Sequence, residues 1–271
     1  MPAIEALDTA CAAALLAASV REAGLLALSM FGKPLKNWTK GGSSPVCEAD
    51  IAVDALLHER LAGEPGTAWM SEESADDPAR LSSSSLWIVD PIDGTRGYIA
   101  GLPDWAVSAA LVTDGRPIAA CLFAPVTDEF FMALAGQGAT RNGERMVVRS
   151  GADLAGMQVA GPKNFLDRVA GVAPPFALVP RIHSLALRLA RVAQGAIDAA
   201  VAGGNSHDWD LAAADLLVHE AGGLLTRFDG EPLTYNRAVP RHGMLVAAGR
   251  DRHAALIQLL TDPRLAPLKS A

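Results

Sequence analysis

Apolar side chains recur every three or four positions along the first thirty residues of the chain. Spacing of this kind lines one face of an α-helix, so residues 4–30 are predicted to form one long, alanine-rich amphipathic helix. Gly32 and Pro34 follow directly and end it. The positions that keep the helical spacing are Ile4, Leu7, Cys11, Leu15 and Ala18.

A loop, a helix and two strands are predicted next. Residues 36–45 are rich in Gly and Ser and carry lysines, which indicates a mobile loop. Residues 48–61 return to helical spacing. The apolar runs 68–71 and 86–89 are predicted strands, and the second runs straight into an Asp-Pro pair. The candidate buried positions of the helix are Ile51, Ala55, Leu56 and Leu61.

Short apolar runs separated by turns fill residues 105–149. Asp114-Gly115 and Asn142-Gly143 are dipeptides that favour tight hairpin turns, so an antiparallel meander is predicted here. Its strands are expected at Val107–Thr113, Ile118–Pro125, Phe130–Ala135 and Arg145–Arg149.

Helical and strand-like patterns alternate in the rest of the chain, and no internal repeat is found. Helices are predicted at 185–194, 210–221 and 252–260, strands at 197–201 and 224–226, and a loop at 171–175. We therefore expect an α+β half, residues 1–145, that binds metal, and an α/β half, residues 146–271, that completes one site at the seam.

Composition excludes several classes of protein. Of the 271 residues, 50% are apolar and 20% charged, which is ample for a large core and excludes a disordered chain. The net charge of −7, with no run of Lys or Arg, argues against a partner that is a nucleic-acid polymer. Arg21-Glu22 interrupts the apolar N-terminal stretch and acidic residues precede it, so neither a membrane span nor a signal peptide is expected. Three widely spaced cysteines suit the reducing cytoplasm.

The strongest chemical signal is the hexapeptide 90–95, Asp-Pro-Ile-Asp-Gly-Thr, at the end of a buried strand. Pro91 cannot donate a backbone hydrogen bond, so the chain is expected to leave the sheet there. Asp90 and Asp93 can then converge on one point, and Thr95 can open a helix whose N–H groups accept a phosphate. Carboxylates beside an anion require a cation between them, and oxygen ligands favour Mg²⁺. The alternative is a strand-to-helix turn in which Asp90 only caps the next element.

Two further carboxylates are candidates for the same site. Glu72 ends a strand that can lie beside the strand leading to Asp90, although acidic residues 72–77 are also typical of a solvated loop. Asp210 begins a helix, where it either caps the helix or supplies a ligand from the second half. Four such carboxylates suit a two-metal site for in-line phosphoryl displacement. The alternative from another class is a protein that binds a metal or phosphate ligand without catalysis.

Several segments occur together in the order of one enzyme family. They are Ser44–Asp50, Ser71–Ser74, Trp87–Thr95, Trp209–Ala213 and Glu220–Gly223. This set resembles the inositol monophosphatase superfamily from about Lys36 to the last helix. The resemblance implies a Mg²⁺-dependent, lithium-sensitive phosphomonoesterase that forms a homodimer. It also implies a layered αβαβα sandwich, α+β in class, with an antiparallel sheet in the first half and a mixed sheet in the second.

The resemblance also implies a role for individual residues. The metal ligands would be Glu72, Asp90, Asp93, Asp210 and the carbonyl oxygen of Ile92. The catalytic residues would be Thr95, Asp50 and Glu72, with Thr95, paired with Asp50, orienting the attacking water. The substrate contacts would be Gly94, Thr95, His207 and Arg188.

The resemblance implies that the substrate is a small phosphorylated metabolite, and it narrows the choice among candidate substrates. In animal inositol monophosphatases a glutamate seven residues before the Trp-Asp aspartate binds inositol hydroxyls, but that count falls here on Gly203. Residues 44–50 and 230–236, together with Arg188, instead resemble bacterial 3′(2′),5′-bisphosphate nucleotidases. A nucleotidase is therefore preferred to an inositol monophosphatase. Histidinol phosphatase and sugar bisphosphatase are the alternatives.

Overall fold

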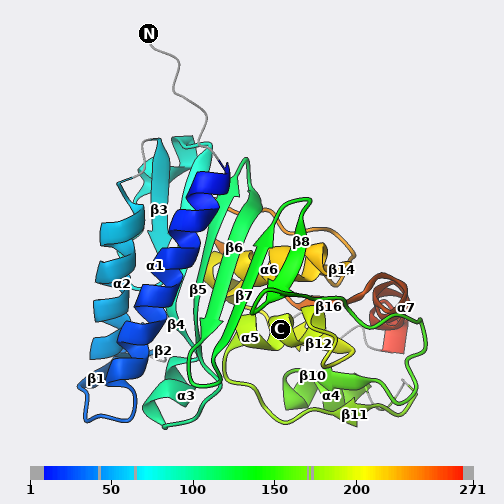
Figure 1. Cartoon of the computed structure of the whole chain (residues 1–271). Coiled ribbons are helices and arrows are strands. Elements are labelled where there is room, and N and C mark those ends of the chain that lie inside the picture. The colour runs from blue at the N-terminus through cyan, green and yellow to red at the C-terminus, as the bar shows by residue number, and fades with distance from the viewer. Residues whose placement is uncertain (1–8, 42–43, 64–65, 170, 172–173, 265–271) are drawn as a thin grey trace.

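The chain folds into five alternating layers (Figure 1), seen in a computed structural model that describes residues 9–41, 44–63, 66–169, 171 and 174–264. A seven-stranded and a five-stranded sheet alternate with three pairs of helices. Helices α1 (Thr9–Met30) and α2 (Glu48–Leu61) cover the outer face of the larger sheet. Helices α5 (Leu185–Ala193) and α6 (Asp208–Glu220) lie between the two sheets. Helices α4 (Lys163–Val169) and α7 (Arg250–Leu260) cover the outer face of the smaller sheet. The expected αβαβα sandwich is confirmed.

The larger sheet is built mainly from the predicted meander. Its strands, in spatial order, are β3 (Thr67–Ser71), β4 (Ser85–Asp93), β5 (Ala106–Thr113), β6 (Arg116–Ala124), β7 (Glu129–Leu134), β8 (Gly138–Arg141) and β9 (Glu144–Arg145). Pairing is antiparallel from β4 to β9, but β3 runs parallel to β4, so the expectation of a purely antiparallel sheet is wrong at this edge. The predicted strand 145–149 contributes only Arg145, because the chain leaves the sheet after it.

The smaller sheet is mixed, as expected. Its strands, in spatial order, are β11 (Ala177–Leu178), β10 (Gln158–Ala160), β12 (Ala199–Ala202), β16 (Leu245–Gly249) and β14 (Gly223–Arg227). The first three run parallel, and β16 is antiparallel to both β12 and β14. Strands β10 and β11 were not predicted, since runs of two or three residues carry no readable periodicity. The short elements outside both sheets are β1 (Asn37–Lys40), β2 (Ser44–Cys47), a 3₁₀ turn (Pro78–Ser82), α3 (Thr95–Ile99), β13 (Ser206–His207) and β15 (Arg241–His242).

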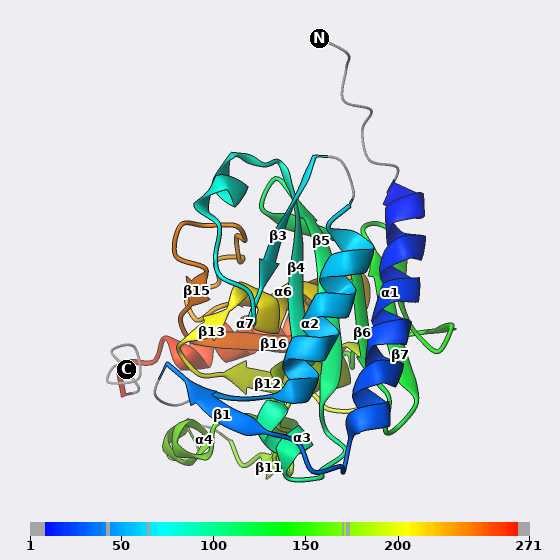
Figure 2. The same ribbon diagram turned by 90° about the vertical axis from the view of Figure 1, so that its left-hand side faces the viewer.

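Helix α1 is confirmed over its described residues, but the apolar face is rotated from the predicted one. Cys11 and Ala18 are exposed, whereas the buried side is made mostly of small residues. A side chain at Gly24 would meet the ring of Phe123 at 2.2 Å, so the helix lies very close to β6. Among the described residues α1 is the one helix long and apolar enough to cross a membrane, and here that apolar face packs against α2, β5 and β6. Figure 2 shows α1 and α2 side by side over the sheet.

Helix α2 begins and ends where predicted, yet its buried face is also different. Of the candidate buried positions only Leu61 is fully buried, Leu56 is half-buried, and Ile51 and Ala55 are exposed. The buried residues are Ala49, Asp50, Val53, Leu57 and Leu61. The rotation has a functional consequence, because it turns Asp50 into the protein.

Residues 36–45 do not form the predicted loop. Strands β1 and β2 pair as an antiparallel hairpin, with Asn37 opposite Cys47 and Lys40 opposite Ser44, and residues 42–43 at its tip lie outside the described residues. Most of the segment predicted as a loop is therefore paired strand.

One hydrophobic core joins the two sheets. It combines residues of β4 to β8 with α5, α6, β12, β14 and β16, so α5 and α6 contact both sheets. The division into halves 1–145 and 146–271 stays a prediction, since this shared core shows how the halves pack and not whether each folds alone.

Candidate active site

Two carboxylates meet at the end of the parallel pair β3–β4. Ser71 lies opposite Val89, and the backbone N–H of Glu72 donates to the Val89 carbonyl at 3.2 Å. Parallel strands bring their carboxyl ends to the same edge of a sheet, so Glu72 and Asp90 become neighbours. The expectation that Glu72 joins the site from the adjacent strand is supported by this register.

A β-bulge brings Asp93 to the same side as Asp90. In a regular strand residues three apart point to opposite faces. Here Asp90 pairs with Ser108 and Asp93 with Ala106, so two residues, Pro91 and Ile92, stand opposite one. The extra residue reverses the alternation. The chain therefore stays in β4 through Asp93. The prediction that it leaves the sheet at Pro91 is wrong.

Asp210 enters from the second half of the chain. It is the third residue of α6, and its Oδ2 accepts a hydrogen bond from the backbone N–H of His207 at 2.6 Å. His207, not Asp210, is the capping residue, so the simple N-cap role considered for Asp210 is wrong. The capping bond orients the carboxylate while leaving oxygen lone pairs for a cation.

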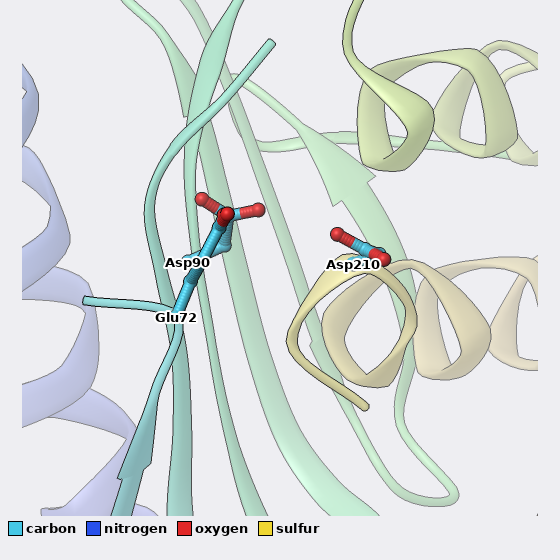
Figure 3. A group of neighbouring side chains, drawn as sticks. All are labelled: Glu72, Asp90 and Asp210. Carbon is cyan, nitrogen blue, oxygen red and sulfur yellow. The ribbon is translucent and has the colours of Figure 1, made fainter. Parts of the chain in front are cut away.

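Glu72, Asp90 and Asp210 converge, as Figure 3 shows, with the first two on neighbouring chain segments and the third facing them from the start of α6. Each offers one oxygen, and the three oxygens lie within 4.8 Å of one another. Asp90 Oδ1 is buried and has no hydrogen-bond partner among the described residues. A buried carboxylate oxygen without a donor needs a cation, and an all-oxygen set suits Mg²⁺. The residues present therefore fit a divalent metal site.

Burial dominates the electrostatics of this cluster. It raises the pKa of Asp90 well above its ordinary value, and the neighbouring Glu72 adds to the shift. It likewise raises the pKa of Asp210, with Asp93 as the next cause. Burial raises the pKa of Asp93 to about 6, although hydrogen bonds from Ser184 and Ala186 oppose the rise. Carboxylates held this close repel one another until a cation neutralises them.

Thr95 and Asp50 form the pair that the resemblance implied. Thr95 Oγ1 lies 2.9 Å from Asp50 Oδ1 and 2.9 Å from the carbonyl oxygen of Ile92. The other oxygen of Asp50 accepts hydrogen bonds from the backbone N–H and the thiol of Cys47. Burial raises the pKa of Asp50. Asp50 reaches Thr95 because it lies on the buried face of α2, which differs from the face that the sequence predicted.

Gly94 occupies a position that only glycine can fill. Its φ of 97° lies in the left-handed region, and an added Cβ would lie 3.0 Å from the Ser184 nitrogen and 3.2 Å from the Asp104 oxygen. This close approach places the start of α5 against the start of α3. Ser184 Oγ donates to Asp93 Oδ2 at 2.6 Å and Ala186 N–H donates to it at 2.5 Å, while Ser184 also caps α5.

The carboxylates, Gly94 and Thr95 line a cavity of about 180 Å³. Ser44, from one of the segments that carry the resemblance, also lines it, together with three residues that the sequence had not indicated, Arg96, Arg181 and His183. His183 Nδ1 lies at hydrogen-bond distance, 2.8 Å, from Asp104 Oδ2, and the backbone N–H of His183 donates to the same oxygen. Nothing in the local spacing reveals these contacts, although Ser184 before a helical run is a readable N-cap signal.

The two other predicted substrate contacts lie outside this cavity. His207 stacks on Trp209 with ring centroids 4.5 Å apart, next to Asp210. Burial lowers the pKa of His207, and Arg241 adds to the effect. Arg188 lies on α5 and lines a separate cavity that adjoins the first.

Lys40 connects the β1–β2 hairpin to the acidic cluster. Its Nζ lies 2.6 Å from Glu73 Oε1 and 3.2 Å from Glu72 Oε1, and it also donates to the Glu72 carbonyl. Burial opposes the charge of Lys40, but Glu72 and Glu73 outweigh it and raise the pKa of Lys40. The hairpin is thus fastened to the outer side of Glu72.

The chain is similar in sequence to known proteins. The chain matches the family model described as "Inositol monophosphatase family" over residues 8–263. Inositol-1-monophosphatase of Mesorhizobium japonicum is 33% identical over 234 residues, which cover 83% of this chain and 85% of that protein. The protein named Nus factor SuhB in Escherichia coli strain K12 is 32% identical over 224 residues, covering 78% and 83%.

Solved structures agree with the sequence comparison. An IMPase of Thermotoga maritima superposes with a TM-score of 0.80 at 26% identity, covering 94% of this chain and 98% of that one. The extragenic suppressor protein suhB of Bartonella henselae superposes with a TM-score of 0.80 at 27% identity, covering 92% and 98%.

Proposed function

Since this chain belongs to the inositol monophosphatase family, we propose that it is a Mg²⁺-dependent phosphatase of small phosphomonoesters. The observation that carries the proposal is the convergence of the Glu72, Asp90 and Asp210 oxygens within 4.8 Å beside the hydrogen-bonded pair Thr95–Asp50. A binding protein would need only the cluster, whereas hydrolysis also needs a group that positions water, which the hydroxyl–carboxylate pair can supply.

The metal ligands in this proposal are Glu72, Asp90, Asp93, Asp210 and the carbonyl oxygen of Ile92. When bound, Mg²⁺ would polarise the phosphoryl group, make a water molecule a stronger nucleophile and neutralise the leaving oxygen. The backbone N–H groups of Gly94 and Thr95 would hold the phosphate at the start of α3, and Glu72 would assist the attacking water.

Thr95 and Asp50 would orient and deprotonate the water. A hydroxyl has one proton to donate and lone pairs with which to accept. When Thr95 donates to Asp50, its lone pairs are left to accept a hydrogen bond from water. Because burial raises the pKa of Asp50, that carboxylate is also a stronger proton acceptor than an exposed aspartate.

Replacement of Thr95 by valine tests this role. Valine keeps the shape of threonine and loses the hydroxyl, so we expect kcat to fall about 10²-fold, the usual contribution of a positioned proton acceptor, with the fold unchanged. Steady-state kinetics and circular dichroism measure both. Thr113→Val is the matched control, because Thr113 lies away from the site, where its Oγ1 hydrogen-bonds with Ser85 Oγ at 3.2 Å on the neighbouring strand β4. A Thr95→Val enzyme within twofold of wild type would remove Thr95 from the mechanism.

The substrate proposed first is a 3′(2′),5′-bisphosphate nucleotide, with inositol monophosphate second. The similarity to an Inositol-1-monophosphatase favours the second candidate. Histidinol phosphate and a sugar bisphosphate complete the panel. Phosphate release from the four compounds, with Mg²⁺ and with a chelator, tests the activity and ranks the substrates by kcat/KM.

The same assay tests the alternative class. Several relatives carry the name Nus factor SuhB rather than the name of an enzyme. Calorimetric binding of Mg²⁺ without phosphate release from any compound in the panel would favour a binding protein on this fold.

The proposal includes the setting in which the protein works. We infer a cytoplasmic homodimer, inhibited by lithium, that binds neither a membrane nor a nucleic-acid polymer. The net charge of −7 supports the absence of a nucleic-acid partner, and the lack of a disulfide between cysteines of the described residues supports the cytoplasm. Sedimentation equilibrium should then give twice the chain mass of 28.2 kDa, and a monomer would contradict it.

A further inference from the structure

The proposed reaction needs a proton donor as well as a proton acceptor. Hydrolysis of a phosphomonoester ends with an alcohol, so the leaving oxygen must gain a proton when its bond to phosphorus breaks. Asp50 is the proposed acceptor of the proton from the attacking water. In an in-line displacement the water and the leaving oxygen lie on opposite sides of the phosphorus, so one group cannot serve both. A second proton-exchanging group is therefore expected at the cavity.

The lining of the active-site cavity offers one suitable side chain. Among the described residues that line it, the carboxylates belong to the candidate metal site, and Ser44 and Thr95 carry hydroxyls. Arg96 and Arg181 also line it, but a guanidinium group keeps its protons in proteins. The remaining polar side chain is His183, and an imidazole exchanges a proton readily near neutral pH.

Asp104 fixes the imidazole of His183. Its Oδ2 lies 2.8 Å from Nδ1 of the ring and also accepts a hydrogen bond from the backbone N–H of His183 at 2.6 Å. The backbone carbonyl of Asp104 accepts a third hydrogen bond, from the N–H of Ser184 at 3.1 Å. A carboxylate at one ring nitrogen holds the hydrogen there and leaves the other nitrogen, Nε2, to exchange a proton. Nε2 has no hydrogen-bond partner among the described residues.

Close packing holds this pair beside the place proposed for the phosphate. A Cβ added at Gly97, on α3, would lie 3.1 Å from Cβ and 3.2 Å from Cγ of His183, and 3.3 Å from Asp104 Oδ1. The imidazole therefore lies directly against α3, the helix whose first N–H groups would hold the phosphate. The cavity of about 180 Å³ has the volume of about six water molecules, so a phosphate bound in it lies close to the whole lining.

Asp50 and His183 approach the cavity from different layers of the fold. Asp50 lies on α2, in the outer layer, whereas His183 comes just before α5, which lies between the two sheets (Figure 1). This arrangement suits a proton acceptor and a proton donor that act on opposite sides of one phosphorus atom.

We propose that His183 is the general acid of the reaction and that Asp104 is a positioning residue that orients its ring. The inference rests on the proposed function, because only hydrolysis produces a leaving oxygen. The water oxygen forms the new bond to phosphorus and its proton passes to Asp50. The electrons of the broken bond stay on the leaving oxygen, which takes the proton from His183 Nε2 and departs as an alcohol. Proton exchange with solvent then restores both side chains.

Replacing one atom of the substrate tests this role. The probes are the panel compound with the highest kcat/KM and its analogue in which sulfur replaces the oxygen that joins the leaving group to phosphorus. A thiolate leaves without a proton, because a thiol ionises far more readily than an alcohol. In His183→Gln we expect kcat to fall about 100-fold with the oxygen compound and less than about fivefold with the sulfur compound, at unchanged KM.

Two further variants accompany this test. His58→Gln is the matched control, because His58 lies on α2 outside the cavity, with its ring against Trp69 at a centroid distance of 5.0 Å. It should keep both rates. Asp104→Asn should lower kcat more for the oxygen compound than for the sulfur compound, since a neutral amide holds the ring hydrogen less strongly than a carboxylate.

The outcomes separate this inference from the proposed function. If the wild type hydrolyses a panel compound and His183→Gln lowers both rates by the same factor, the phosphatase stands and His183 has only a structural role. A kcat of His183→Gln within about twofold of wild type on the oxygen compound also overturns the general acid. Phosphate release from no panel compound would contradict the proposed function, and with it the inference.

Discussion

Replacing Asp93 by asparagine is expected to lower kcat by about 10³-fold or more while the protein stays folded. The change removes one charge from the cluster of carboxylates and barely alters the shape. Asp93 Oδ2 accepts hydrogen bonds from Ser184 and Ala186, so the carbonyl oxygen of an asparagine would take that position. Its NH₂ group would then face the cation, and a metal site contributes several kcal/mol to phosphoryl transfer.

The control for Asp93→Asn is the same substitution at a turn. Asp114 adopts a φ of 50°, which asparagine tolerates, and it lies in the β5–β6 hairpin turn. Asp114→Asn should keep full activity. Both variants are compared by kcat and by thermal melting. An Asp93→Asn enzyme with wild-type kcat would show that the carboxylate cluster is not the catalytic site.

Mg²⁺ is expected to stabilise the protein strongly at pH 8 and weakly at pH 5. A ligand at about 100 times its Kd adds about 2.7 kcal/mol to the free energy of unfolding, which corresponds to a rise in Tm of about 5–10 °C for a chain of this size. Burial holds the pKa of Asp93 at about 6 and raises those of Asp90 and Asp210. At pH 5 these groups carry protons that the metal must displace, so binding weakens as the pH falls.

The same pKa values determine how the stability of the metal-free protein depends on pH. A carboxyl group whose pKa is higher in the folded state binds more protons there than when unfolded, so its contribution to stability falls as the pH rises from about 4 to above 6. The Asp93→Asn variant has no ionisable side chain at position 93. The stability of the variant relative to wild type should therefore rise by about 1 kcal/mol from pH 5 to pH 8 without metal.

Differential scanning calorimetry at both pH values, with Mg²⁺ or with NaCl of equal ionic strength, measures these effects. In Asp93→Asn the Mg²⁺-dependent rise in Tm at pH 8 should shrink. Equal Mg²⁺ shifts at pH 5 and pH 8 in the wild type would show that the buried carboxylates do not bind the cation.

The carboxylates could be predicted because their signal is local. A buried strand whose last residues include Asp-Pro and a helix whose first turn contains Trp-Asp each place a carboxylate near the end of an element, whatever the rest of the fold does. The pairing of β3 with β4 then brings Glu72 beside Asp90. Two other residues of the second half were, unlike Asp210, not predictable in this way. Arg181 and His183 reach the site only through the packing of α5 against α3, which no short-range pattern records.

The buried faces of α1 and α2 also could not be predicted from local patterns. Periodicity identifies a helix when apolar and polar residues alternate clearly. In α1 nearly every residue is apolar or small, so several faces fit the pattern equally well. The buried face is the one that contains Gly24, because only a residue without a side chain allows the close approach of α1 to β6. In α2 the burial of Asp50 was unexpected, since an aspartate is normally placed on the polar side. Its hydrogen bonds to Thr95 and Cys47 satisfy it inside.

The amino-acid sequence by itself determined the order of the main elements and the four carboxylates of the candidate site, because hydrophobic periodicity, turn dipeptides and Asp-Pro are short-range signals. The layered class of the fold followed from the resemblance to the inositol monophosphatase superfamily. Only the tertiary structure decided which helix faces are buried, that a β-bulge aligns Asp93 with Asp90, and that Asp104 fixes His183 at the wall of the active-site cavity. These depend on contacts between residues far apart in the sequence, such as Asp93 and Ser184, which are 91 positions apart, where close packing and not local preference selects the arrangement.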